Sequence, residues 1–177
     1  AKKELDDPEV DMSPLFETII NYIPEPEGDP EAETQVLIST IDYNEFVGRI
    51  GIGKIDSGSL KLNQDCVIVN HHDPDKMKKV KIGKLYVFDG LKRVEVQNAT
   101  IGEIVAISGI PDIHIGDTLC SPEKPEAIPF QKISEPTISM NFMVNDSPLA
   151  GQEGKFITSR HLRDRLFREL NTDVSLR

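Results

Sequence analysis

The sequence predicts a mainly β protein, in which an antiparallel β-barrel is followed by a partial α+β domain. Between residues 34 and 130, short runs rich in β-branched residues alternate with turn-forming residues, and no helical periodicity interrupts them. Many short strands at this spacing favour a barrel or a sandwich over a parallel sheet. After residue 130 the pattern changes to an alternating strand and an amphipathic helix. The chain of 177 residues is long enough for one large or two small domains.

The leading segment, residues 1–33, is predicted to end a preceding domain and to form an interdomain linker with one short helix. Ser13 and Pro14 suit a helix N-cap and first turn, and apolar residues follow at helical spacing until Pro24. Residues 25–31 combine proline with acidic side chains, a composition that stiffens and extends a linker. The segment holds 11 acidic and 2 basic residues, so most of the chain's net charge of −10 lies here.

Residues 34–130 are predicted to form the barrel. Residues 56–58 and 72–75 are rich in glycine, proline and aspartate, which mark turns between strands. The predicted strands are residues 35–41, 46–55, 65–69, 80–88, 92–96, 104–107 and 118–120.

A glycine-rich stretch in the second of these strands resembles part of a phosphate-binding loop. Gly48, Gly53 and Lys54 match the first part of that motif, but Ile55 stands where the motif needs a hydroxyl for magnesium. A phosphate-binding loop also leads directly into a helix, whereas residues 56–58 predict a turn before another strand. We therefore expect a strand that runs into a tight turn, and no nucleotide site in this chain.

Residues 131–177 are predicted to begin an α+β domain that they are too short to complete. Residues 137–144 alternate apolar and polar side chains as in a strand, and residues 153–170 carry an apolar stripe at helical spacing. Residues 173–177 are predicted to start a returning strand. Such a partial sheet has an unpaired edge.

The sequence predicts no catalytic or metal-binding set. His71 and His72 lie near Asp73 and Asp75, but adjacent strand residues point to opposite faces, which favours a solvated hairpin loop over a metal site. The two cysteines are far apart in apolar surroundings, which indicates reduced core thiols. No run of about 18 apolar residues is present, so no membrane span is predicted.

Basic side chains supply the candidate contact residues. Lys79 and Lys81 alternate with apolar residues in a predicted strand, so they share a solvent face. They suit either a charged guard on an edge strand or a patch that contacts RNA phosphates without reading sequence. Arginines on the predicted helix suit either exposed i,i+4 pairing or contact with RNA or another domain. The candidates are Arg49, Lys79, Lys81, Lys84, Lys92, Arg93, Arg160 and Arg165.

Three blocks carry a resemblance to a known family. Residues 48–58, Gly-Arg-Ile-Gly-Ile-Gly-Lys-Ile-Asp-Ser-Gly, resemble the second domain of translational GTPases, a β-barrel. Residues 145–155, Asn-Asp-Ser-Pro-Leu-Ala-Gly-Gln-Glu-Gly-Lys, are followed by Thr-Ser-Arg at residues 158–160. Together with residues 12–26, this block narrows the resemblance to the TypA/BipA family of ribosome-associated GTPases.

The resemblance implies a domain for each part of the chain. Residues 1–33 would end the GTPase domain and form its linker, and residues 34–130 would be a translation-factor-type barrel. Residues 131–177 would begin a third domain with a split β-α-β, ferredoxin-like fold. Because the chain begins with alanine rather than methionine, we expect it to be part of a longer protein.

For the whole protein, the resemblance implies GTP hydrolysis, ribosome binding in the bacterial cytoplasm, and a role in ribosome assembly or stress-adapted translation. GTP and magnesium would bind only in a GTPase domain that this chain lacks, so the chain alone is not expected to be an enzyme. Its partners would be ribosomal RNA and proteins, the GTPase domain and the C-terminal domains, with no DNA or membrane partner. The acidic net charge argues against a general nucleic-acid binder.

Two alternatives remain open from the sequence. An elongation-factor-like barrel would bind a protein or tRNA partner and would have no ribosome affinity of its own. A metal- or nucleotide-dependent enzyme would instead be built around residues 71–75 or 48–54.

Overall fold

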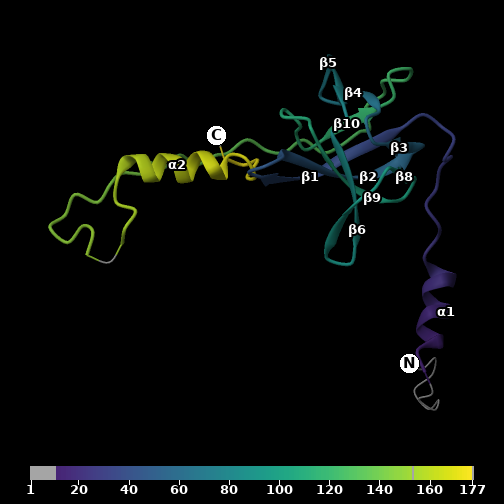
Figure 1. Ribbon diagram of the computed structural model, residues 1–177, viewed down its shortest axis with the longest axis horizontal. Helices are drawn as coiled ribbons and strands as arrows, with labels where there is room; N and C mark the ends of the chain where they lie inside the picture. The colour runs from purple at the N-terminus through teal and green to yellow at the C-terminus, as the bar shows by residue number, and fades with distance from the viewer. Residues whose placement is uncertain (1–10, 153, 177) are drawn as a thin grey trace.

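The computed structural model describes residues 11–152 and 154–176 (Figure 1). In this described part, a β-sheet body lies between two helices that extend away from it (Figure 1). Helix α1 spans Ser13–Tyr22 and helix α2 spans Ser159–Glu169. The strands are β1 (Gln35–Asn44), β2 (Gly48–Ser57), β3 (Ser59–Lys61), β4 (Asp65–Asn70), β5 (Asp73–Lys81), β6 (Lys84–Asp89), β7 (Lys92–Glu95), β8 (Asn98–Thr100), β9 (Ile104–Ser108) and β10 (Asp117–Cys120).

The strands form one large and one small antiparallel sheet. The large sheet has eight strands in the order β5-β4-β10-β1-β2-β9-β6-β7, and β3 pairs with β8 in the small sheet. Separate backbone hydrogen bonds join the corners, such as those from Ile82 N to Gln64 O at 3.1 Å and from Leu62 N to Gln97 O at 2.9 Å. The predicted mainly β, antiparallel architecture is confirmed. The sheet is not a closed barrel, however, because β5 and β7 remain its edges.

The larger of two hydrophobic core clusters forms between the strands of the two sheets, and a smaller one holds Val67, Val69 and Cys120. On β1, Val36 and Ile38 are buried at the two-residue period of a strand. A β-bulge at Ser39 then shifts the inward face, so that Ile41 rather than Thr40 is buried. The largest fully buried side chains include Ile38, Ile55, Leu60, Ile82, Leu85, Ile107, Ile110, Ile113 and Leu119.

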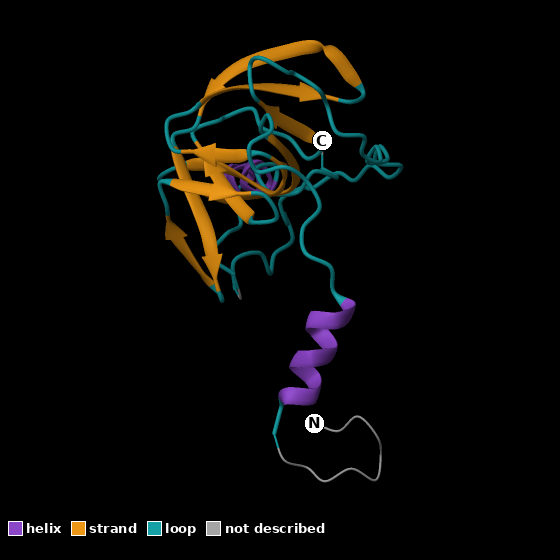
Figure 2. Ribbon diagram, turned by 90° about the vertical axis from the view of Figure 1, so that its right-hand side faces the viewer, coloured by secondary structure: helices purple, strands orange, loops and turns teal. Residues whose placement is uncertain are grey.

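Helix α1 forms where the apolar spacing predicts it and ends before Pro24. The predicted Ser13 cap is wrong by one residue, because Met12 occupies the N-cap position. Asp11 Oδ1 instead accepts a hydrogen bond from the Ser13 backbone N–H at 2.9 Å. None of the helix residues is buried, and Figure 2 shows the helix standing clear of the sheets. The part of segment 1–33 before residue 11 lies outside the described residues.

The linker packs against the sheets before the first strand begins. The Pro26 ring covers Gly102, where an added Cβ would lie 2.4 Å from Pro26 Cγ. Further along, Gly58 N donates to Asp29 O at 3.1 Å. These contacts hold the chain against the sheets from Pro26 onward. The direction of α1 relative to the sheets therefore depends on the few residues between Tyr22 and Pro26.

Several predicted boundaries in the β region are wrong, most clearly at residues 72–75 and 80–88. The run 80–88 is two strands rather than one, because Gly83 leaves the ladder and donates its N–H to Ser108 O at 3.0 Å. The predicted turn at 72–75 lies mostly inside β5. Pro74 is tolerated in that strand because β5 is a sheet edge, where the missing backbone donor can face solvent.

The predicted C-terminal helix exists but starts later than residue 153, which itself lies outside the described residues. It begins at Ser159, and Thr158 is its N-cap, with Oγ1 accepting from His161 N at 3.4 Å. No helix of the described residues is long and apolar enough to cross a membrane.

Neither predicted strand of the third domain is present in the described residues. Residues 137–144 have no strand structure, and residues 173–176 lie in turns and irregular backbone. Alternating side chains give a strand only when a neighbouring strand satisfies its backbone groups. No described strand pairs with residues 137–144, so the split β-α-β domain is not confirmed.

Candidate functional site

The outer face of β5 carries two lysines that point into solvent. Lys79 and Lys81 are exposed, whereas Val80 between them packs against the core cluster. The predicted alternation is therefore confirmed. Neither lysine forms an ion pair with another described residue, and both lie on an edge strand. We call Lys79 and Lys81 the β5 lysine pair.

The other lysines of β5 are neutralised on the opposite face. Lys76 Nζ lies 2.5 Å from Asp73 Oδ2, and Lys78 Nζ lies 2.5 Å from Asp112 Oδ2. The Lys78 hydrogen bond lowers the pKa of the Asp112 carboxyl. These four side chains form part of the lining of a pocket of about 310 Å³. The four lysines of β5 thus form two sets, one with acidic partners and one without such partners among the described residues.

Lys84, Lys92 and Arg93 lie on β6 and β7, at the opposite edge of the sheet from β5. Figure 1 shows the two edges on opposite sides of the body, so Lys92 and Arg93 do not continue the β5 lysine pair. Lys84 Nζ lies 3.3 Å from Glu95 Oε2, and Arg93 forms an ion pair with Asp42 of β1. Lys92 is exposed and forms no ion pair with a described residue.

The two candidate arginines of α2 are paired within the helix. Arg160 Nε lies 4.0 Å from Asp164 Oδ2, and Arg165 forms an ion pair with Glu169. Both pairs have the i,i+4 spacing that stabilises a helix, as one of the two sequence interpretations predicted. Their heads remain exposed to solvent.

Arg49 connects the sheets with α2. Its Nη2 donates to the backbone oxygen of Leu170, just beyond the helix, at 3.3 Å. A second contact lies beside it, where Arg168 Nη2 is 3.4 Å from Glu45 Oε1. Nothing in the sequence places the β1–β2 hairpin beside α2, so sequence reasoning does not single out Glu45 or Arg168.

A charged cluster around His114 is also not predicted by the sequence. Asp117 is buried, and its carboxylate accepts hydrogen bonds from His114 N at 2.8 Å and from Asn70 Nδ2 at 2.9 Å. The His114 Nδ1 atom lies 3.8 Å from the same carboxylate. Asp117 raises the pKa of the His114 imidazole above its ordinary value, whereas partial burial and the charge of Arg49 lower it.

This cluster gives a pH dependence of stability. A histidine whose pKa is higher in the folded state stabilises the fold while it is protonated, and this stabilisation is lost as pH rises through the folded pKa. Between about pH 6 and pH 8, the wild-type urea midpoint should therefore fall more than that of His114→Gln. The His114 side chain is 65% exposed, so solvent screening limits the difference to less than about 1 kcal/mol. Identical pH profiles for the two proteins would contradict this assignment.

The glycine-rich stretch of residues 48–54 lies in a continuous strand, β2, which pairs with β1 and β9. It leads through Gly58, at φ +69°, into β3 rather than into a helix. The predicted strand is confirmed, but the turn predicted at residues 56–58 is reduced to a bend at Gly58, because β2 continues to Ser57.

Burial raises the pKa of the Cys66 thiol to about 12. Among the described residues, no group of three or more histidine, cysteine or carboxylate side chains is placed to hold a metal ion.

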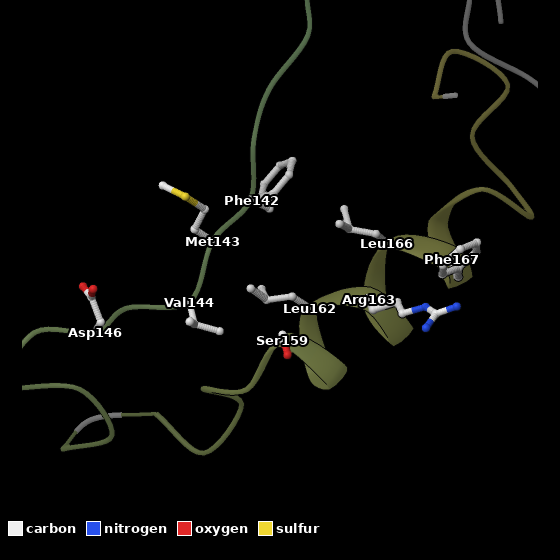
Figure 3. A pocket seen from close by; sticks show the side chains of 9 residues that line it. All are labelled: Phe142, Met143, Val144, Asp146, Ser159, Leu162, Arg163, Leu166 and Phe167. Atoms are coloured by element: carbon white, nitrogen blue, oxygen red, sulfur yellow. The ribbon is translucent and has the colours of Figure 1, made fainter.

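An apolar groove of about 590 Å³ lies between α2 and the extended segment before it. Figure 3 shows Leu162 and Leu166 of α2 on one side of this groove, with Phe142 and Val144 on the other. The apolar stripe of the helix therefore faces this segment, in place of the sheet that the sequence predicted.

Comparisons with known proteins agree with this fold. Residues 48–120 match the family described as elongation factor Tu domain 2. The whole chain is 50% identical to the large ribosomal subunit assembly factor BipA of Synechocystis sp. and spans 29% of that protein. Over 94% of the chain, the BipA proteins of Salmonella typhimurium and Bacillus subtilis are 44% and 42% identical, and the chain spans 27% of each. The chain thus belongs to the TypA/BipA family of translational GTPases and contains the family's elongation factor Tu domain 2 region.

Proposed function

We propose that this chain is the ribosome-docking and interdomain-relay part of a GTP-binding protein that acts in ribosome assembly or stress-adapted translation. The relatives named above are large ribosomal subunit assembly factors, and the chain spans under a third of their length. In this proposal, GTP and magnesium bind in a domain outside the chain, and the chain itself hydrolyses nothing. The protein acts in the cytoplasm, with ribosomal RNA and proteins as partners.

The observation that carries the docking role is the β5 lysine pair. Four of the eight basic side chains in the candidate set have an acidic partner among the described residues, and a paired cation gains less from a phosphate. Lys79 and Lys81 have no such partner among the described residues, share one face and lie on an open edge. Two adjacent cations on a flat edge suit two phosphates of an RNA backbone, which they position without reading base sequence.

Co-sedimentation of this chain with bacterial ribosomes and with separate subunits, over a salt series, tests the docking role. Lys79→Glu combined with Lys81→Glu should weaken binding about tenfold or more at low salt. The negative slope of log K against log salt should also become less steep by about 2. The matched control is Lys132→Glu with Lys155→Glu. It makes the same change in net charge on exposed residues outside the sheets, and should bind like wild type.

If both double variants weakened binding equally, the effect would come from net charge alone. The β5 lysine pair would then not be part of the ribosome interface. No binding by the wild-type chain at low salt would place ribosome affinity in other domains. The barrel would then be an elongation-factor-like module for a protein or tRNA partner.

A further inference from the structure

The end of α2 meets the hairpin that joins β1 and β2 at two charged contacts. Arg49 Nη2 donates to Leu170 O at 3.3 Å, and Arg168 Nη2 lies 3.4 Å from Glu45 Oε1. A pocket of about 450 Å³ at this junction is lined by residues of the hairpin, by residues 109–112 after β9 and by Asn171. Figure 1 shows the yellow C-terminal segment reaching the tip of β1 and β2.

Each contact has a physical reason to form at this end of the helix. The last carbonyl groups of a helix lack partners within it, and the helix dipole places partial negative charge there. The Arg49 guanidinium therefore meets both an open acceptor and a favourable potential at Leu170. Arg168, in the last turn of α2, places a cation at the same end of the helix and forms an ion pair with Glu45 of the hairpin.

The same contacts are weak enough to open. Both side chains of the Glu45–Arg168 pair are about two thirds exposed, and exposed ion pairs contribute little and are screened by salt. The chain leading to α2 is fixed to the sheets at Phe130, whose backbone oxygen lies 2.9 Å from His72 Nε2. Between Phe130 and the helix the described residues form irregular backbone and turns, so α2 is joined to the sheets by a loop at one end and by two polar contacts at the other.

The hairpin side of the junction makes contacts of its own with the β6–β7 edge. Asp42, near the end of β1, pairs with Arg93 of β7, and this pairing lowers the pKa of the Asp42 carboxyl. The Arg93 guanidinium also lies 5.8 Å from the centre of the Phe88 ring of β6. The hairpin thus contacts the β6–β7 edge as well as α2. When the junction opens, we therefore expect α2 to move relative to the sheets while the hairpin stays in place.

We propose that the β1–β2 hairpin and the end of α2 form a salt-sensitive latch, in which Arg49 and Glu45 hold the C-terminal part of the chain in one orientation on the sheets. When the latch opens, α2 swings on the loop after Phe130. The latch is the physical element of the interdomain relay, and its role in signalling, though not its existence, rests on the proposed function.

Nuclear magnetic resonance of the whole chain tests the latch directly, through residual dipolar couplings and ¹⁵N relaxation. At low salt, α2 and the large sheet should fit one alignment tensor and one tumbling time. Arg49→Ala with Arg168→Ala should give α2 a separate tensor and faster apparent tumbling, and high salt should shift wild type in the same direction. The matched control is Arg160→Ala with Arg165→Ala, which removes two arginines of α2 whose partners lie within the helix. It should keep one tensor.

A charge exchange separates the latch from any change in helix content. Glu45→Arg and Arg168→Glu should each open the latch, and the double exchange should restore it, with a coupling of about one and a half to fivefold in the closed-to-open ratio. Amide shifts of α2 report in every variant whether the helix is still folded. Independent tumbling of α2 in the wild-type protein at low salt would overturn the proposal, as would equal behaviour of the two double-alanine variants. The β5 lysine pair is intact in all of these proteins. The result of the ribosome-binding assay for the docking role is therefore independent of whether the latch exists.

Discussion

Replacing Ile107 with alanine should lower the free energy of unfolding by about 2–5 kcal/mol. Ile107 is fully buried on β9, in the interior of the large sheet, between Gly51 of β2 and Leu85 of β6. Its truncation removes apolar contacts within the core cluster and leaves a cavity there. Urea unfolding followed by far-ultraviolet circular dichroism measures the change, since the chain has no tryptophan for fluorescence.

Ile104 on the same strand provides the control. It is 56% exposed at the start of β9, and Ile104→Ala removes the same atoms from a site that is largely in water. The expected loss is less than about 1 kcal/mol, mostly from the lower strand propensity of alanine. Similar losses for the two variants would mean that Ile107 does not lie in a packed core.

Gly58→Ala should destabilise the fold by about 2–4 kcal/mol. Gly58 has φ +69°, which disfavours any residue with a Cβ, and an added Cβ would lie 2.4 Å from the backbone oxygen of Ala32. Ala32 belongs to the linker, so the clash would push the linker from the sheets and break the hydrogen bond from Gly58 N to Asp29 O. The measurement is again the free energy of unfolding in urea.

Gly90→Ala separates the two causes. Gly90 has a similar φ of +60° in the β6–β7 hairpin, but nothing lies within 4 Å of an added Cβ. Gly90→Ala should therefore lower the free energy of unfolding by about 1 kcal/mol, the cost of the left-handed backbone conformation alone. If Gly58→Ala lowers the free energy of unfolding no more than Gly90→Ala does, the linker does not pack on the sheets in solution.

Local pattern predicts the elements of this fold where local chemistry decides them. Helix α1 follows from apolar spacing ended by Pro24, and the two faces of β5 follow from strict alternation around Val80. The break at Gly83 depends on Ser108, which lies far away in sequence and accepts its N–H. Residues 137–144 have the alternation of a strand, but their state depends on a partner strand that alternation cannot supply.

The candidate contact residues show the same division. Exposure of Lys79 and Lys81 can be predicted from their position in an alternating run. The pairing of Arg93 with Asp42 and the contact between Arg49 and Leu170 cannot, because both join segments that only the tertiary fold brings together. A basic residue is thus easy to recognise in sequence, whereas its availability for a partner is a property of the fold.

The position of β10 in the large sheet sets the order in which the protein can be completed during its own synthesis. Among the described residues β10 is the last strand in sequence, yet it lies between β1 and β4, and Cys120 pairs with Gln35 at the start of β1. One edge of β1 and one edge of β4 therefore stay open until β10 has emerged from the ribosome that makes it. The two parts of the large sheet on either side of β10 can therefore join only after residues 117–120 have been made, although the other strands of both parts precede β10 in the chain.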